Sequence, residues 1–148
     1  MNEQKQEALA FARSVQAGFL ATVEKGENGF DQPRVRGVLM WYVDESGFYF
    51  HTAKSKDLYQ QLTLNPRVEI AFVSQQPVAR MLRVWGDVDF IEDRYEKERL
   101  LAERPWLLQY GEEGDNQMLS IFRIVNSEGK FWQKETNMQE KTATLISF

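Results

Sequence analysis

The stretch from Pro33 to Val68 most constrains the fold, because three regular patterns follow one another in it with very short connections. Arg34–Val43 and Phe48–Thr52 are strand-like, and an Asp-Glu-Ser-Gly sequence between them is typical of a hairpin turn. A helical pattern covers Ser55–Leu64 and is stopped by Asn65-Pro66. The stretch therefore predicts an antiparallel hairpin that leads directly into a short helix.

Strand-like and helical runs of similar length occupy the rest of the chain. Further strands are predicted at Phe19–Val23, Arg67–Ser74, Ala79–Ile91, Leu119–Val125 and Lys130–Lys134, and further helices at 2–17 and 92–103. About seven strands with inserted helices predict one mainly β domain over residues 1–148, built as a closed or partly open antiparallel barrel.

Four local features make this prediction more specific. Gly18 is placed to end the first helix. The run Val38–Trp41 is apolar without interruption, which predicts a strand covered on both faces. Gly86 indicates a bulge or a close backbone approach, and Ser127-Glu-Gly129 is expected to be a hairpin turn. Residues 106–117 show no regular pattern and are expected to be irregular.

Composition excludes several classes of protein. The chain has no cysteine, which removes disulfides, thiolate nucleophiles and iron–sulfur clusters. No apolar run approaches the roughly 20 residues of a membrane helix, and the acidic residues of the N-terminus are unlike a secretory signal, so a cytoplasmic protein is expected. A net charge of −4 without a basic stripe argues against nucleic acid as a partner. The aromatic fraction of 13% suits a ligand pocket, a subunit interface or simply the core.

Positive charge is concentrated in one block of this acidic chain. Residues 34–83 contain seven Lys or Arg and four Asp or Glu, whereas the rest contains 11 basic and 18 acidic residues. Two hydroxyls and two amines stand where the predicted helix begins, at Thr52, Lys54, Ser55 and Lys56. Together with Arg36 on the preceding strand, they indicate a site for a phosphate-like anion, with a solvated loop as the alternative.

Other candidates for chemistry are few. His51 is the only histidine, so a histidine metal cage is impossible, and a packed side chain is a better expectation than a catalytic base. Asp87 and Asp89 share one face of a strand and form a pair of carboxylates, for which an exposed face is the simpler explanation. No dinucleotide fingerprint or P-loop motif occurs.

The order of the segments resembles the pyridoxamine-5′-phosphate-oxidase-like family of FMN-binding split barrels. The resemblance covers residues from about 18 to 104, with a weaker echo in 122–132. It rests on the spacing of Gly18–Val23, Pro33–Trp41, Phe48–Thr52, Lys54–Lys56, Leu62, Asn65–Val68 and Arg83–Asp87, and on the acidic helix that follows.

This resemblance implies a six-stranded antiparallel Greek-key split barrel, and a homodimer with FMN across the interface. Arg36 would approach the flavin phosphate, and Trp132 would contact the cofactor from the partner subunit. The resemblance further assigns cofactor contacts to the strand Val38, Leu39, Met40 and Trp41, to the strand end His51 and Thr52, and to the phosphate loop Lys54, Ser55 and Lys56.

The implied activity is reduction of a small planar substrate with electrons from a nicotinamide donor. The Arg–x–His substrate motif of true pyridoxamine-phosphate oxidases is absent after residue 123, so the chain looks more like general-stress and nitroimidazole-reductase-like members. No residue of this chain is assigned as catalytic. The alternatives are a non-catalytic flavin-binding or sensing module, or the same fold with F420 or with haem on His51.

Overall fold

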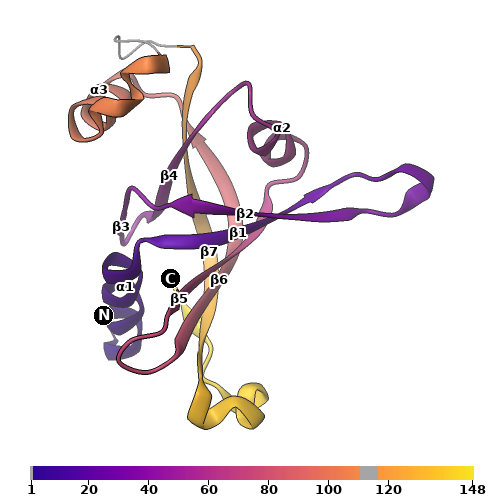
Figure 1. Cartoon of the computed structure of the whole chain (residues 1–148), viewed down its shortest axis with the longest axis vertical. Helices are drawn as coiled ribbons and strands as arrows, with labels where there is room; N and C mark the ends of the chain where they lie inside the picture. Colours follow the sequence, from indigo (N-terminus) through magenta and orange to yellow (C-terminus); the bar gives the residue numbers. More distant parts are fainter. Residues whose placement is uncertain (1, 111–116) are drawn as a thin grey trace.

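The protein is a mainly β structure organised around one antiparallel sheet, seen in a computed structural model that describes residues 2–110 and 117–148 (Figure 1). The strand order is β2-β1-β5-β6-β7-β4-β3, and β8 pairs with β7. The strands are β1 (Ala17–Glu24), β2 (Gln32–Leu39), β3 (Tyr42–Asp44), β4 (Gly47–Ala53), β5 (Arg67–Ser74), β6 (Arg80–Ile91), β7 (Leu119–Gln133) and β8 (Ile146–Ser147).

The described residues also form three α-helices and three 3-10 helices, of which α1 precedes the first strand and the others lie between strands. They are α1 (Glu3–Val15), η1 (Glu27–Gly29), α2 (Asp57–Leu64), α3 (Arg94–Glu103), η2 (Pro105–Tyr110) and η3 (Lys134–Thr142). Within the described ranges the sheet curls but does not close, and six of its strands are long while β3 and β8 are short. The predicted mainly β split barrel is therefore confirmed. No helix of the described residues is long and apolar enough to span a membrane.

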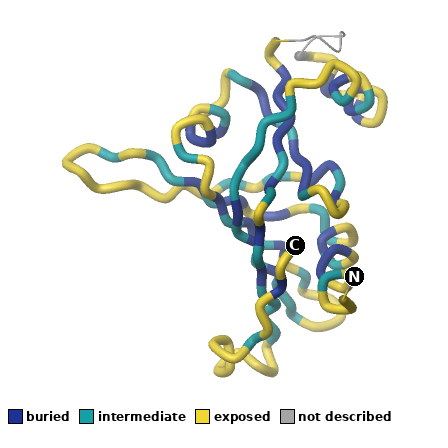
Figure 2. Tube along the Cα trace, turned by 180° about the vertical axis from the view of Figure 1, so that it is seen from behind, coloured by how far each residue is buried: buried dark blue, intermediate teal, exposed yellow. Residues whose placement is uncertain are grey.

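Two apolar clusters hold the fold together. The larger cluster fills the curled sheet with side chains such as Phe48, Phe72 and Phe122, and α1 packs on it. The smaller cluster lies where α3 and η2 pack on the other face of β4 and β7. Most of β4 and the first half of β7 are consequently buried on both faces. Figure 2 shows dark, buried segments in the middle of the molecule.

The end of the first helix differs from the prediction. Asn2 caps α1 as expected from its type, accepting a hydrogen bond from the Lys5 amide at 2.7 Å. The helix ends at Val15, and Gln16 takes the positive φ of 65°. Gly18 already belongs to β1, where a Cβ would lie 3.0 Å from the Ile70 side chain. Its glycine identity therefore reflects close strand packing rather than a helix cap.

The predicted strand over Arg34–Val43 is divided in two. β2 ends at Leu39, and the chain turns at Met40 and Trp41 before β3 begins. β2 is an edge strand, and Leu39 is 46% exposed, so the prediction that both faces of this run are covered is wrong for the single chain. Met40 and Trp41 are buried because they leave the strand and enter the two apolar clusters.

The last predicted hairpin is also wrong. β7 continues through Ser127-Glu-Gly129 as one strand of 15 residues, and this segment pairs with β6. Gly129 is required there because a Cβ would lie 2.5 Å from the Arg83 carbonyl oxygen. The prediction for Gly86 is confirmed, since the β6–β7 register shifts between Trp85 and Asp87.

The β1–β2 hairpin projects from the body of the molecule (Figure 1). Phe30 lies in its tip, between the end of β1 at Glu24 and the start of β2 at Gln32, and is 77% exposed. Residues 106–110 form η2 rather than an irregular segment, while the rest of the predicted irregular stretch lies mostly outside the described residues.

Candidate functional site

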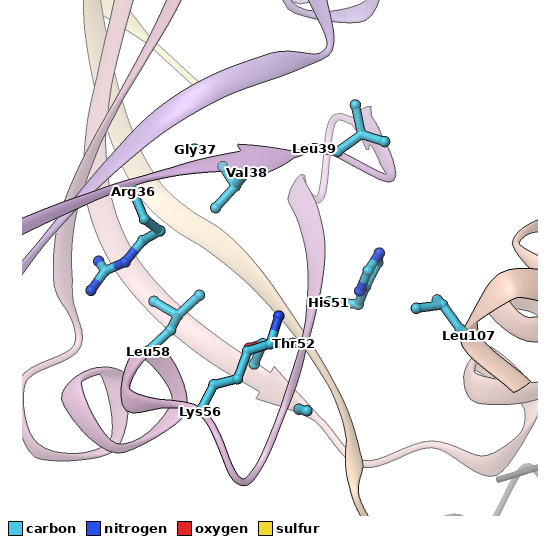
Figure 3. Close-up of a pocket in the computed structure, with 10 residues that line it drawn as sticks. Arg36, Gly37, Val38, Leu39, His51, Thr52, Lys56, Leu58 and Leu107 are labelled. Carbon is cyan, nitrogen blue, oxygen red and sulfur yellow. The ribbon is translucent and has the colours of Figure 1, made fainter. Parts of the chain in front are cut away.

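A cleft of about 310 Å³ opens between the edge strand β2, the end of β4, the start of α2 and η2 (Figure 3). Its polar lining comes from Arg36, His51, Thr52 and Lys56. Its apolar lining includes Val38, Leu39 and Leu107. The structure therefore brings together most of the residues that the sequence assigns to cofactor binding.

Arg36 reaches the cleft from β2 with its guanidinium fixed by three acceptors. Nη1 donates to the Thr22 hydroxyl at 2.7 Å and to the Leu20 carbonyl at 3.3 Å, and Nη2 donates to Gln61 Oε1. The Thr22 hydroxyl in turn donates to Gln61 Oε1 at 2.7 Å. Burial lowers the pKa of Arg36, and the nearby Asp57 carboxylate opposes that effect. A buried pair of polar side chains thus orients the cation.

The sequence interpretation missed Thr22 and Gln61. Both side chains are buried, and they come from β1 and α2, 39 residues apart. A faint signal existed for Gln61, since it lies three residues after Leu58 and beside Leu62 on the buried face of α2. A polar residue on such a face needs a partner, but the sequence does not indicate which one.

The outer edge of β2 offers backbone groups to the cleft. The Met40 amide donates to the Gln16 carbonyl. Because backbone groups alternate in direction along an antiparallel strand, the N–H and C=O of Val38 point toward β1, and those of Gly37 and Leu39 point outward. A Cβ on Gly37 would meet nothing within 4 Å. Within the strand Val38–Trp41, only Leu39 therefore turns its backbone groups toward this outer edge, together with Gly37 before it.

Backbone groups of Met40 and Trp41 are already engaged in hydrogen bonds within the chain. The Trp41 amide donates to the Tyr49 carbonyl at 2.7 Å. Arg104 donates to the Met40 carbonyl at 2.6 Å and to the Leu39 carbonyl at 3.4 Å. Trp41 also donates from Nε1 to the Glu103 carboxylate. Neither Met40 nor Trp41 lines this cleft.

Thr52 carries the most informative polar atom of the site. The residue is only 3% exposed, and Oγ1 has no hydrogen-bond partner among the residues that the structure describes. The hydroxyl of Ser120, which lies opposite Thr52 on β7, is also buried and has no partner in the described part of the chain. A buried hydroxyl without a partner costs about 1–3 kcal/mol, so a ligand that bonds to Thr52 would recover this energy.

Of the predicted phosphate loop Lys54–Lys56, only Lys56 lines the cleft. Lys56 precedes α2, and its amine extends into the cleft beside Thr52 (Figure 3). Lys54 instead pairs with Glu92 at 3.2 Å and lies 5.8 Å from the Tyr59 ring centroid. Ser55 is exposed, and neither Lys54 nor Ser55 lines the cleft. The predicted helix start at Ser55 is also shifted, since α2 begins at Asp57.

His51 lines the cleft as a neutral imidazole. Burial, the Arg104 guanidinium and the Lys56 amine together lower the pKa of His51 to about 4. The side chain is therefore uncharged at neutral pH and suits packing or a neutral hydrogen bond.

This lowered pKa predicts a pH dependence of stability. The unfolded chain binds a proton at His51 below about pH 6.5 and the folded chain only below about 4, so acidification favours unfolding in that window. Between pH 7 and pH 5 the wild type should lose about 2 kcal/mol of unfolding free energy more than His51→Gln, measured by urea denaturation. Equal losses in the two proteins would show that His51 titrates normally in the folded state.

Trp132 lies far from the cleft of its own chain. Thr52 pairs with Ser120, and Trp132 follows twelve residues later on β7, or about 40 Å of strand. Its indole Nε1 donates to Asn137 of η3 at 2.7 Å. Figure 1 places η3 at the end of the molecule opposite α2. Trp132 therefore does not line this cleft within one chain.

The two strand carboxylates are engaged in ion pairs. Asp87 pairs with Arg67 at 2.9 Å, and Asp89 pairs with Arg123 at 3.0 Å. Arg67 and Arg123 lie on β5 and β7, the two neighbours of β6. The two ion pairs therefore link β6 to its neighbouring strands, and the two aspartates do not act as a pair.

Comparison with known proteins identifies the family. A family model described as pyridoxamine 5′-phosphate oxidase matches residues 4–133, so the chain belongs to this family, as the resemblance predicts. A search of curated proteins gives no match.

Solved structures share the fold at low sequence identity. A NimC/NimA family protein from Clostridium acetobutylicum is 23% identical with a TM-score of 0.75, and the match covers 99% of this chain and 94% of that chain. A pyridoxamine 5′-phosphate oxidase-related, FMN-binding protein from Nostoc punctiforme is 15% identical with a TM-score of 0.62, covering 98% and 94%. HutZ, the haem storage protein from Vibrio cholerae, is 17% identical with a TM-score of 0.60, covering 82% and 87%.

Proposed function

We propose that the chain binds FMN in the cleft and acts as an oxidoreductase on a small planar substrate, with electrons from a nicotinamide donor. The single observation that carries the proposal is the buried Thr52 hydroxyl, which has no partner among the described residues and lies beside the Lys56 amine and the fixed Arg36 guanidinium. Two cations and a free hydroxyl suit a terminal phosphate, because charge and hydrogen-bond donors converge on one anion. Membership of a family with FMN-binding relatives supports the same cofactor.

The flavin ring would lie along the outer edge of β2. Gly37 and Leu39 have outward-facing backbone groups, and the missing side chain of Gly37 lets a flat ring approach the strand. Bound FMN would supply the hydride chemistry, while these residues orient the ring and Leu39 and Leu107 restrict water. His51 would contribute a neutral contact rather than a proton at neutral pH.

A second copy of the chain would complete the site. The cleft lies beside an edge strand whose Val35 and Leu39 are exposed in the single chain, and an exposed apolar strand edge favours pairing with a partner. Trp132 is remote from its own cleft, so any contact with the cofactor would be made in the cleft of the other subunit. A homodimer and a cytoplasmic location remain predictions from the sequence.

Titration with FMN tests the proposal. We expect binding to quench flavin fluorescence with a dissociation constant in the micromolar range or below, and Thr52→Val or Lys56→Ala to weaken it about tenfold each. Lys54→Ala is the matched control, because Lys54 lies in the same loop but pairs with Glu92. Light scattering of the loaded protein gives the oligomeric state.

Three outcomes would contradict this assignment. Failure to bind FMN in large excess would rule out FMN as the cofactor. Equal losses of FMN affinity in Lys54→Ala and Lys56→Ala would show that the phosphate site is wrongly assigned. Binding of FMN without oxidation of NADH or NADPH above the rate of free FMN would favour the non-catalytic flavin-binding module.

Haem is a second candidate for the cleft. His51 lines it with a neutral imidazole, the form in which histidine binds iron, and HutZ shares the fold. The same protein should be titrated with haem, and His51→Ala should then abolish the shift of the haem absorption band. FMN is the stronger proposal because the Thr52, Lys56 and Arg36 cluster suits a phosphate.

A further inference from the structure

A second pocket, of about 550 Å³, adjoins the flavin cleft. Leu39 lines both, and the 3-10 helix η2 contributes Leu107 to the cleft and Trp106 to the second pocket. The side chains that matter for its chemistry are those of Trp41, Tyr42, Arg99, Arg104 and Trp106. The pocket thus combines aromatic rings with two guanidinium groups.

Arg104 provides a buried charge that has no acidic ion-pair partner among the described residues. Its side chain belongs to a residue that is only 5% exposed, and it donates to the carbonyl oxygens of Leu39 and Met40. It forms no ion pair in the part of the chain that the structure describes. Burial lowers the pKa of Arg104, and the neighbouring Glu103 acts in the opposite direction. A buried cation held only by carbonyl groups is costly, and an anion beside it would offset the cost.

The aromatic lining provides flat surfaces next to this charge. The Arg99 guanidinium lies 4.7 Å from the ring centroids of both Trp41 and Tyr42. Trp106 is 57% exposed, and its ring centroid lies 5.9 Å from the Arg104 guanidinium. An exposed indole beside a buried guanidinium suits a ligand that is both flat and anionic.

The acidic groups near the pocket are already engaged. Glu96 pairs with Arg99 at 2.9 Å. Glu103 itself lines the pocket, and its carboxylate accepts the indole Nε1 hydrogen of Trp41. Arg99 thus already has a carboxylate partner, whereas Arg104 is the lining cation without an ion pair among the described residues.

From this geometry we propose that the second pocket binds a small planar aromatic carboxylate, with its ring against Trp106 and its anionic group toward Arg104. The inference rests on the proposed function for one point only, that this ligand is the substrate next to the flavin. The shared wall at Leu39 places the two ligands side by side.

Calorimetric titration with 2-naphthoate, and with the neutral 2-naphthamide as its matched control, tests the inference. We expect the naphthoate to bind at least tenfold more tightly than the amide, both with and without FMN. Trp106→Leu should weaken naphthoate binding about five- to tenfold and leave FMN affinity within twofold, because Trp106 does not line the flavin cleft. Arg104→Met should remove the preference for the anion, with circular dichroism as the check on folding.

The outcomes separate this inference from the proposed function. Equal affinity for naphthoate and naphthamide, or no effect of Trp106→Leu, would overturn the second site whether or not Arg104→Met folds. Competition between naphthoate and FMN would also overturn it, because the pocket would then be part of the flavin site. Binding of naphthoate by a protein that does not bind FMN would support the second site and contradict the proposed function.

Discussion

Replacing Phe122 with alanine is expected to lower the free energy of unfolding by about 3–5 kcal/mol, the cost of emptying a large site in a packed core. Phe122 is fully buried on β7 and stacks on Phe50 of β4 with ring centroids 5.3 Å apart. Phe90 of β6 meets the same ring edge-on at 6.5 Å. One ring therefore connects three neighbouring strands, and urea denaturation measures its loss.

Phe30→Ala is the matched control for this core substitution. Phe30 lies at the tip of the projecting β1–β2 hairpin and is mostly exposed, so its removal should change stability by less than about 0.5 kcal/mol. A loss below about 1 kcal/mol for Phe122→Ala would mean that β4, β6 and β7 are not packed around this ring.

Local patterns were sufficient to predict most strands. In β5 the residues Val68, Ile70 and Phe72 alternate with less buried ones, as a half-buried strand requires. The hairpin between β3 and β4 could be predicted because its turn is stabilised by its own residues. Asp44 pairs with Gly47 across a two-residue turn, and the Asp44 side chain accepts a hydrogen bond from the Ser46 amide. These signals arise within a few residues and do not depend on the rest of the fold.

The errors arose where distant segments decide the local structure. Ser127-Glu-Gly129 has the composition of a turn, but pairing with β6 keeps it extended. Its glycine is required because the Arg83 carbonyl leaves no room for a side chain. Leu39 reads as a core residue, yet it lies on an edge strand whose partner in the chain is on one side only. No window of sequence around these positions contains that information.

The candidate site shows the same division. Arg36, Thr52 and Lys56 could be assigned because hydroxyl and basic residues at a strand–helix junction indicate an anion site. The roles of Lys54 and Lys56 could not be separated, since the partner of Lys54 is Glu92, 38 positions away in the connection between β6 and α3. The Thr22–Gln61 pair that holds Arg36 likewise depends on the packing of α2 against β1.

The substitution with the largest expected effect on ligand binding is Arg36→Met. It removes the fixed guanidinium from the cleft, and the loss of charge-assisted hydrogen bonds to the phosphate should weaken FMN binding about 10- to 100-fold. The fold should survive, because Thr22 and Gln61 remain bonded to each other. Fluorescence titration measures the affinity, and thermal unfolding verifies that the variant is folded.

Riboflavin, which lacks the phosphate, makes this prediction specific. If Arg36 binds the phosphate, riboflavin should bind the wild type and Arg36→Met within about twofold of each other, while FMN separates them. Arg34→Met is the control on the same strand, because Arg34 pairs with Glu24 at 2.6 Å and does not line the cleft. An equal loss for riboflavin and FMN would show that Arg36 supports the shape of the cleft and does not bind the phosphate. In that case Lys56 and Thr52 alone would have to hold the anion.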